Sequence, residues 1–183
     1  MSNAALAQQL AAGTWTVDPT HSRVGFVARH MMVSKVRGSF SDYTAEITIA
    51  DDPLQSSLRA EVQMASIDSG NADRDGHLRT NDFFDIEHFP TMTLVATNFE
   101  PNGEDFTMTA DLTIRGVTRS VDFDLAFEGS GTDPWGGTRA GFTASTTINR
   151  KDFGMEYNAA LETGGVLIGE KVQIELDIQL VKA

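Results

Sequence analysis

The sequence predicts a mainly β protein, built as a single antiparallel barrel of about eight strands with a short helical insertion near residues 71–86. Three observations carry this prediction. Apolar and polar residues alternate with a period of two along much of the 183-residue chain, which is typical of strands with one buried face. Short turn signals separate the alternating segments, and one long polar connection interrupts them.

The alternation is clearest in five segments. They are residues 43–49, 58–64, 106–114, 121–127 and 172–180. In the third segment, Phe106, Met108 and every second residue after them are apolar, whereas the residues between them are Thr and Asp. Each of these segments is expected to bury one face and to expose the other.

Four weaker segments extend the set of strands. They are residues 15–17, 23–30, 91–99 and 140–148. Their alternation is mixed, but each is rich in β-branched or aromatic residues, as strands usually are. Together the segments predict about eight or nine strands.

The turns between these segments are mostly tight. Pro101-Asn102-Gly103 has the composition of a hairpin turn, residues 115–118 make a second reversal, and residues 129–137 form a longer glycine-rich loop. Close hairpins imply antiparallel neighbours. Closure into a barrel removes exposed edges and leaves room for one small ligand, while a β-sandwich is the alternative with the same pattern.

The connection over residues 68–90 is too long for a hairpin. It is expected to hold a short helix capped by Ser69 or Asn71 and ended by Pro90. Part of it also resembles a calcium-loop template, at Asn71, Asp73, Asp75, Gly76, Leu78 and Asp82. Residues 60–64 before it alternate like a strand rather than an entering helix, so we expect a polar capped helix and no metal site.

The chain is expected to form one domain over residues 13–183, preceded by a disordered or frayed N-terminus over residues 1–12. The first residues lack the basic start and apolar run of a secretory signal, which predicts a cytoplasmic protein, or a periplasmic or secreted one if a signal was trimmed. No stretch approaches the roughly 18 apolar residues that span a bilayer, so stable membrane insertion is not expected.

Charge and composition narrow the functional classes. The formal net charge of −12 argues against nonspecific nucleic-acid binding and against docking onto an anionic membrane through a basic patch. The absence of cysteine excludes disulfides, thiol catalysis and cysteine-ligated zinc. The sequence also lacks a nucleophile elbow, a zinc-protease motif, a phosphate-binding glycine loop and a dinucleotide fingerprint.

Five short motifs, in order, resemble the YceI-like family. They are GTWTVDPTHS at 13–22, RGSF at 37–40, HLR with DFFD within 77–85, LTIRGVT at 112–118 and INRKDFG at 148–154. The resemblance covers about residues 14–182. It implies an extended, lipocalin-like barrel that binds a polyisoprenoid, an isoprenoid quinone or a similar long-chain lipid, and that often forms a homodimer.

Apolar residues on the inward strand faces and in the insertion are the candidate ligand-binding residues. They are Phe26, Met32, Phe40, Met64, Phe83, Phe84, Met92, Leu94, Phe106, Met108, Leu112, Phe123, Phe142 and Met155. Phe and Met provide a flexible, polarisable wall that suits a chain-like ligand. Taken singly, each of these residues is also explained by ordinary core packing.

Four polar residues are candidates for contact with a lipid head group, namely His30, Arg37, Arg79 and Arg150. Arginine suits planar, bidentate contacts with phosphate or carbonyl oxygens. The alternative for the arginines is a surface or loop-stabilising role, and for the histidine a hydrogen bond that fixes a loop.

The sequence therefore predicts a non-catalytic protein that sequesters or transports a long apolar lipid, with no other cofactor and no metal. The first alternative is an enzyme acting on a lipid in the same barrel through His30 or His77. The second is a structural or stress-related protein whose apolar interior is only core.

Overall fold

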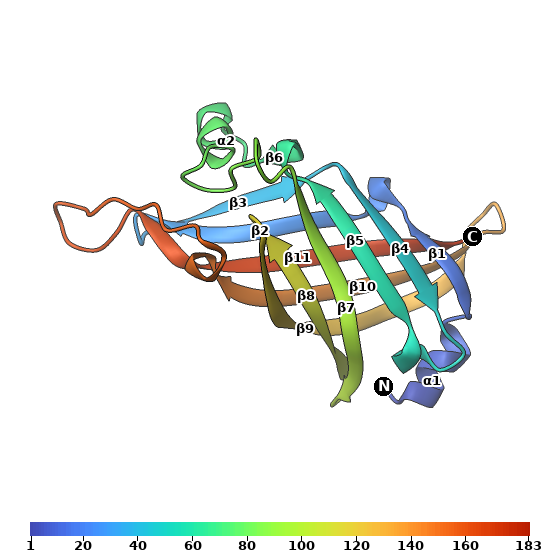
Figure 1. Ribbon diagram of the computed structural model, residues 1–183. Helices are drawn as coiled ribbons and strands as arrows, with labels where there is room; N and C mark the ends of the chain where they lie inside the picture. The colour runs from blue at the N-terminus through green and yellow to red at the C-terminus, as the bar shows by residue number, and fades with distance from the viewer.

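The computed structural model describes residues 1–183 and is built mainly from strands (Figure 1). The strands are β1 Gly13–Val17, β2 Arg23–His30, β3 Ser34–Phe40, β4 Tyr43–Ile49, β5 Ser57–Gln63, β6 Ile67–Asp68, β7 Thr91–Asn102, β8 Asp105–Ile114, β9 Val117–Thr132, β10 Thr138–Asn149 and β11 Ile168–Lys182. The helices are α1 Asn3–Gln9 and α2 Ala72–Leu78, with four 3-10 turns, η1 Pro19–His21, η2 Pro53–Gln55, η3 Met64–Ser66 and η4 Arg150–Phe153. Neither α-helix has the length or the apolar run that crossing a bilayer requires.

Eight strands form a closed ring. Their order is β1-β4-β5-β7-β8-β9-β10-β11, and β11 pairs again with β1, where Trp15 lies opposite Lys182. All neighbouring strands are antiparallel. The ring confirms the predicted barrel, and it excludes the β-sandwich because no edge separates two sheets.

The other three strands lengthen one side of the barrel. Strand β11 pairs with β1 only through residues 180–182, whereas residues 168–177 pair with β2. Strand β3 then pairs with β2, and β6 pairs with β3. The insertion with α2 follows β6 and lies beside it (Figure 1). The barrel is therefore extended on the side that carries the insertion.

Strand β8 shows why alternation produces this wall. Every second residue from Phe106 to Ile114 is at most 4% exposed. The residues between them face outward, and the Thr109 hydroxyl donates a 2.7 Å hydrogen bond to Asp122 on β9. Register shifts between Ala96 and Asn98 and beside Phe142 mark bulges, which increase strand twist and help a sheet to close.

The turn between β8 and β9 depends on backbone conformations that favour glycine. Arg115 and Gly116 have φ values of 53° and 72°, as in the tight turns that suit the twist of a hairpin. A Cβ atom at Gly116 would lie 2.7 Å from the ring of Phe89. Glycine at this position therefore allows both the turn and the close approach of the insertion.

The N-terminal residues differ from the expected frayed segment. Helix α1 begins after Ser2, whose hydroxyl accepts a hydrogen bond from the Ala5 amide. Leu6 and Leu10 lie one helical turn apart, are 5% and 3% exposed, and pack in one cluster with Trp15. The prediction was wrong for these residues because a short helix that is unstable alone is held by its apolar face against the barrel.

The insertion contains the short capped helix that its sequence predicts. The Asn71 side chain accepts a hydrogen bond from the Arg74 amide at 2.9 Å, and α2 follows. Asp75 is 7% exposed, and one of its carboxylate oxygens accepts bonds from both the amide and the hydroxyl of Ser69. This carboxylate holds the start of the insertion in place.

Candidate functional site

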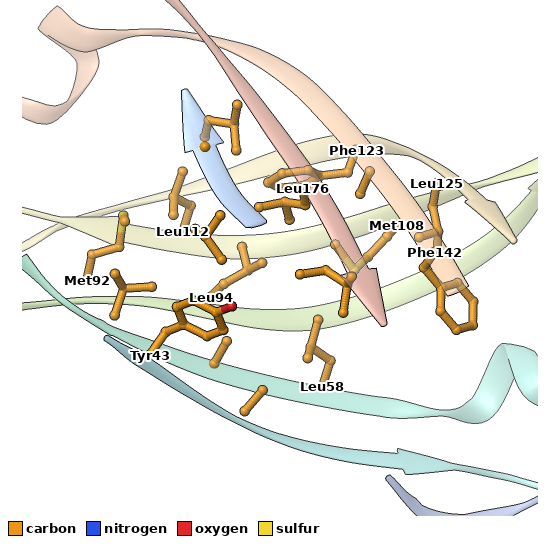
Figure 2. Close-up of a pocket in the computed structure, with 18 of the residues that line it drawn as sticks. Tyr43, Leu58, Met92, Leu94, Met108, Leu112, Phe123, Leu125, Phe142 and Leu176 are labelled. Carbon is orange, nitrogen blue, oxygen red and sulfur yellow. The ribbon is translucent and has the colours of Figure 1, made fainter. Parts of the chain in front are cut away.

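A cavity of about 300 Å³ lies inside the barrel. It is lined by 43 residues, of which 37 are hydrophobic. Side chains from β4, β5, β7, β8 and β11, among them Tyr43, Leu58, Leu94, Met108 and Leu176, converge on this space (Figure 2). The volume falls within the range of small-molecule pockets, and the wall offers a ligand almost no hydrogen-bonding groups.

The period-two pattern positions this wall. On β4 the cavity is lined by Tyr43, Ala45, Ile47 and Ile49, together with the hydroxyl-bearing Thr44 near the strand's start. The same inward alternation continues on β5, β8 and β11. Because each strand contributes several inward residues, the cavity follows the length of the barrel.

The two ends of the cavity have different walls. At the first, which we call the α1 end, Leu6 and Leu10 of α1 close the interior. At the second, the hairpin end, Ala28, Ile168 and Arg150 line it, next to the turn between β2 and β3 and the loop over residues 154–167. Strand β11 runs from the hairpin end to the α1 end (Figure 1).

Most of the candidate ligand-binding residues line the cavity. They are Phe26, Phe40, Phe83, Phe84, Met92, Leu94, Phe106, Met108, Leu112, Phe123, Phe142 and Met155. The other two lie elsewhere. Met32 is 57% exposed in the turn after β2, and Met64 is 2% exposed in a cluster with Phe40 and Ile67, where the strand pattern has given way to η3.

Several lining residues were missing from the candidates drawn from the sequence. Leu6 and Leu10 are the main examples, and their four-residue spacing was the only signal for them. Ile47, Ile174 and Leu176 also line the cavity from strands whose alternation was recognised.

Arg150 is the only charged residue that lines the cavity. It is 3% exposed, and its guanidinium donates hydrogen bonds to the carbonyls of Gly169 at 2.9 Å, Met155 at 2.6 Å and Ile168 at 3.4 Å. It forms no ion pair, and burial lowers its pKa below the ordinary value of an arginine. The interior thus holds one cation at the hairpin end; its hydrogen-bond acceptors are backbone carbonyls, and the negative charge of Glu170 partly opposes the effect of burial.

The other three head-group candidates lie outside the cavity wall. Arg79 donates to the carbonyls of Ala65 and Ile67 at 3.1 and 3.2 Å, which ties the insertion to η3 and β6. Arg37 is exposed on β3, 4.0 Å from Glu175. His30 ends β2 opposite Ser34.

No Asp, Glu or His side chain lines the cavity. His77, the second histidine of the enzyme alternative, contacts Asp82 at 2.8 Å and packs edge-on against Phe83 and Tyr157, with ring centroids 5.0 and 4.9 Å apart. It thereby joins the insertion to the loop over residues 154–167. The wall of the cavity offers burial for an apolar chain and one cationic donor, but no residue of the usual acid–base type.

Comparison with known proteins connects this architecture to a family. Residues 15–180 match the model of the YceI-like domain. A UPF0312 protein of Staphylococcus epidermidis is 40% identical over 160 residues, covering 86% of this chain and 91% of that protein. The crystal structure of Burkholderia cenocepacia BcnA superposes with a TM-score of 0.77 at 23% identity, covering 89% of this chain and 98% of that one. The structure of a polyisoprenoid binding domain from Saccharophagus degradans, implicated in plant cell wall breakdown, superposes with a TM-score of 0.71 at 18% identity. The match covers 92% of this chain and 98% of that one. The chain belongs to the YceI-like domain family, as its sequence motifs indicate.

Proposed function

We propose that the protein binds one long apolar lipid inside the barrel, with the tail toward α1 and the polar head beside Arg150. The observation that carries this proposal is the polarity of the wall: 37 of 43 lining residues are hydrophobic, and the single charge lies at one end. An amphiphile with one small polar group matches that distribution, because every other part of it contacts hydrocarbon.

Burial alone supplies the affinity in this proposal. Each methylene removed from water contributes about 0.8 kcal/mol, so a tail of many carbons needs no hydrogen bonds along its length. Met92, Met108 and Met155 provide adaptable surface for a bent or branched chain. Polyisoprenoids and isoprenoid quinones are the first lipids to test, because the Saccharophagus degradans relative of this fold is described as binding a polyisoprenoid.

We propose further that the bound lipid is sequestered or transported unchanged. The lining lacks carboxylates and imidazoles, and both histidines of the enzyme alternative lie outside it. A lipid recovered intact after prolonged incubation with the protein supports this reading. Conversion of the lipid, retained after purification and lost on mutation of His77, would favour the enzyme.

The first experiment is extraction of the purified full chain with organic solvent, followed by mass spectrometry. A prenyl lipid or quinone at about one molecule per chain is the expected result. A bound fatty acid would keep the cavity but change the lipid class. An empty extract, together with no shift in melting temperature on adding prenyl lipids, would overturn the proposal and leave the interior as ordinary core.

A matched pair of substitutions tests whether the cavity is the binding site. Ala60 lines the cavity from β5, whereas Ala126 on β9 follows the inward residue Leu125 and lies outside the lining. Ala60→Phe places an aromatic ring in a space of about 300 Å³ and should lower bound lipid per chain severalfold. Ala126→Phe should leave it unchanged, with melting curves confirming that both variants fold. Equal lipid content in folded samples of both would contradict the assignment.

A further inference from the structure

The turn between β2 and β3 exposes three consecutive apolar residues. We call Met31, Met32 and Val33 the hairpin tip; their exposed fractions are 45%, 57% and 79%. The only other large hydrophobic residues exposed to a similar degree are Trp135 and Tyr157. Contiguous exposed apolar residues mark surfaces that meet a protein or a membrane.

The backbone conformation of the hairpin tip is also unfavourable for the residues that occupy it. Met31 and Met32 have φ values of 53° and 60°, a left-handed conformation that Asn and Gly adopt far more readily than a long side chain. An Asn-Gly pair would satisfy this turn with less strain and no exposed hydrocarbon. Asp85 and Arg115 also have a positive φ, but only at the hairpin tip are two such non-glycine residues adjacent and their apolar side chains exposed. Strain of this kind at an exposed site points to a function there.

Charge is segregated around the same turn. The chain has 26 acidic residues, yet none lies between Asp18 and Asp42. Arg29 and Lys35 face each other across the base of the hairpin, and neither forms an ion pair. Like charges directly opposite each other destabilise a strand pair, so an anionic partner would relieve this repulsion.

Acidic residues of the same end are partly neutralised by other groups. Glu170, near the start of β11, contacts Lys151 at 2.7 Å, and Glu175, which pairs with Gly25 farther along the barrel, lies 4.0 Å from Arg37. Glu156 and Glu162 lie in the neighbouring loop over residues 154–167 and remain as negative charges there. The hairpin is thus a local basic element on a molecule whose net charge of −12 predicts repulsion from anionic surfaces.

The hairpin tip lies next to the cationic end of the cavity. The Met31 amide donates a 2.7 Å hydrogen bond to the carbonyl of Leu167, and the next residue, Ile168, both lines the cavity and contributes a carbonyl to Arg150. In Figure 1 the turn and the loop over residues 154–167 lie side by side, far from α1 and the C-terminus. A membrane that met the tip would face the end where the lipid head is proposed to lie.

We propose that the hairpin tip docks onto an anionic lipid membrane, with Met31–Val33 entering the interface and with Arg29 and Lys35 contacting lipid phosphates. Apolar residues flanked by basic ones bind such interfaces through combined burial and electrostatic attraction. This contact is peripheral and reversible. The docking itself is independent of the proposed function. Only its purpose, the exchange of a lipid between the cavity and a membrane, rests on that function.

The test is sedimentation of the full chain with vesicles of phosphatidylcholine, alone or mixed with phosphatidylglycerol. The wild type should bind the mixed vesicles, more weakly as salt rises. The double variant Met31→Asn with Met32→Gly keeps a favourable turn and should stay folded but lose binding at least tenfold. Arg29→Gln with Lys35→Gln should lose about fivefold for each charge, since each basic residue near an anionic surface contributes about 1 kcal/mol.

Trp135 provides the control, because it is 86% exposed at the opposite end of β11, about 40 Å from the tip along the strand direction. Trp135→Ser should bind vesicles like the wild type. Loss of binding in Trp135→Ser but not in the Asn-Gly variant would overturn the proposal. So would a wild-type dimer that becomes a monomer in the Asn-Gly variant, which would make the tip a contact between two copies.

Lipid extraction of the same samples separates this proposal from the previous one. Bound lipid without any vesicle binding by the wild type would overturn docking and leave the proposed function intact. Tip-dependent vesicle binding by a protein with an empty cavity would support docking and overturn the proposed function. Both readouts are expected to be positive for the wild type.

Discussion

The two ends of the barrel differ in how their apolar and charged side chains are accommodated. At the α1 end, Leu6 and Leu10 close the interior against Trp15, which is 1% exposed. A partly buried set of ion pairs lies at the same end, where Arg139 contacts Asp18 at 2.6 Å and Asp133 at 2.8 Å. At the hairpin end, Arg150 has no carboxylate partner, and the tip exposes apolar side chains.

This difference shows how stability and function are divided along one barrel. At the α1 end, the helix and the Arg139 cluster satisfy their apolar and charged groups within the chain, and Trp135 is the one large apolar side chain left exposed there. The hairpin end leaves an unpaired buried cation, two facing basic residues and a strained apolar turn. Features that are unfavourable in isolation are expected where a ligand or a surface completes them.

The largest expected effect tests the packing of the α1 end. Trp15→Ala removes a side chain at the centre of this cluster and should lower the free energy of unfolding by about 3–5 kcal/mol, because the remaining side chains cannot fill the space. Urea denaturation measures the loss. Trp135→Ala, on the exposed loop at the same end, should change stability by no more than about 0.5 kcal/mol. Similar losses for the two variants would mean that this end is not packed as described.

A smaller effect is expected from the buried cation of the hairpin end. Arg150→Met removes the donors to the carbonyls of Gly169, Met155 and Ile168 and should cost about 2–3 kcal/mol, since buried unpaired carbonyls are unfavourable. Arg119→Met, which removes one exposed bond to the Asp152 carbonyl, should cost less than about 1 kcal/mol. Retention of a polar-headed lipid by a folded Arg150→Met protein would confine Arg150 to a structural role.

The smallest expected effect is on the pH dependence of stability, which tests the ion pairs of the α1 end. Hydrogen bonds from His21 and Arg139 hold the pKa of Asp18 well below its ordinary value of 3.8. A carboxyl whose pKa is lowered on folding stabilises the protein above its ordinary pKa, and the contribution is lost as the pH falls through the lowered value. The melting temperature should therefore drop on acidification below about pH 4.

Asp18→Asn should reduce this acid-dependent drop in melting temperature while lowering stability slightly at neutral pH. Fluorescence of Trp15 and Trp135, which both lie near this end, can report the transition. If the melting temperature of the variant falls on acidification as much as that of the wild type, other carboxylates govern the loss of stability. Asp133 is the next candidate, because a hydrogen bond from Arg139 lowers its pKa.

Alternation predicted the wall of the barrel well, because inward and outward positions on a strand are a local property. Residues such as Phe106, Leu112 and Phe123 were placed inside from their spacing alone and do line the cavity. The separate segments predicted at residues 15–17 and 23–30 correspond to β1 and β2. What the sequence did not reveal was that β11 pairs with both of them, since the paired residues lie between 138 positions (His30 and Ile168) and 167 positions (Trp15 and Lys182) apart.

The misplacements have local physical causes. Met32 and Met64 have side chains that suit a lipid-binding wall, but both follow the end of a strand, where the alternation no longer sets the direction of a side chain. Arg150 could not be separated from Arg37 and Arg79 by residue type, because burial depends on the surrounding η4 and β11 backbone. Leu6 and Leu10 had the right spacing, but a helix of seven residues shows no partner in its own sequence.

The length of strand β11 sets the length of the cavity. The first residues of β11 supply the carbonyls that hold Arg150, and its last residues pair with β1 beside Trp15. The distance between the cationic head position and the apolar floor is therefore fixed by how many residues β11 contains. A two-residue insertion, matched in the paired strands, would lengthen the barrel by about 7 Å and leave both ends chemically unchanged. Tail length would then be selected by strand length rather than by any single side chain.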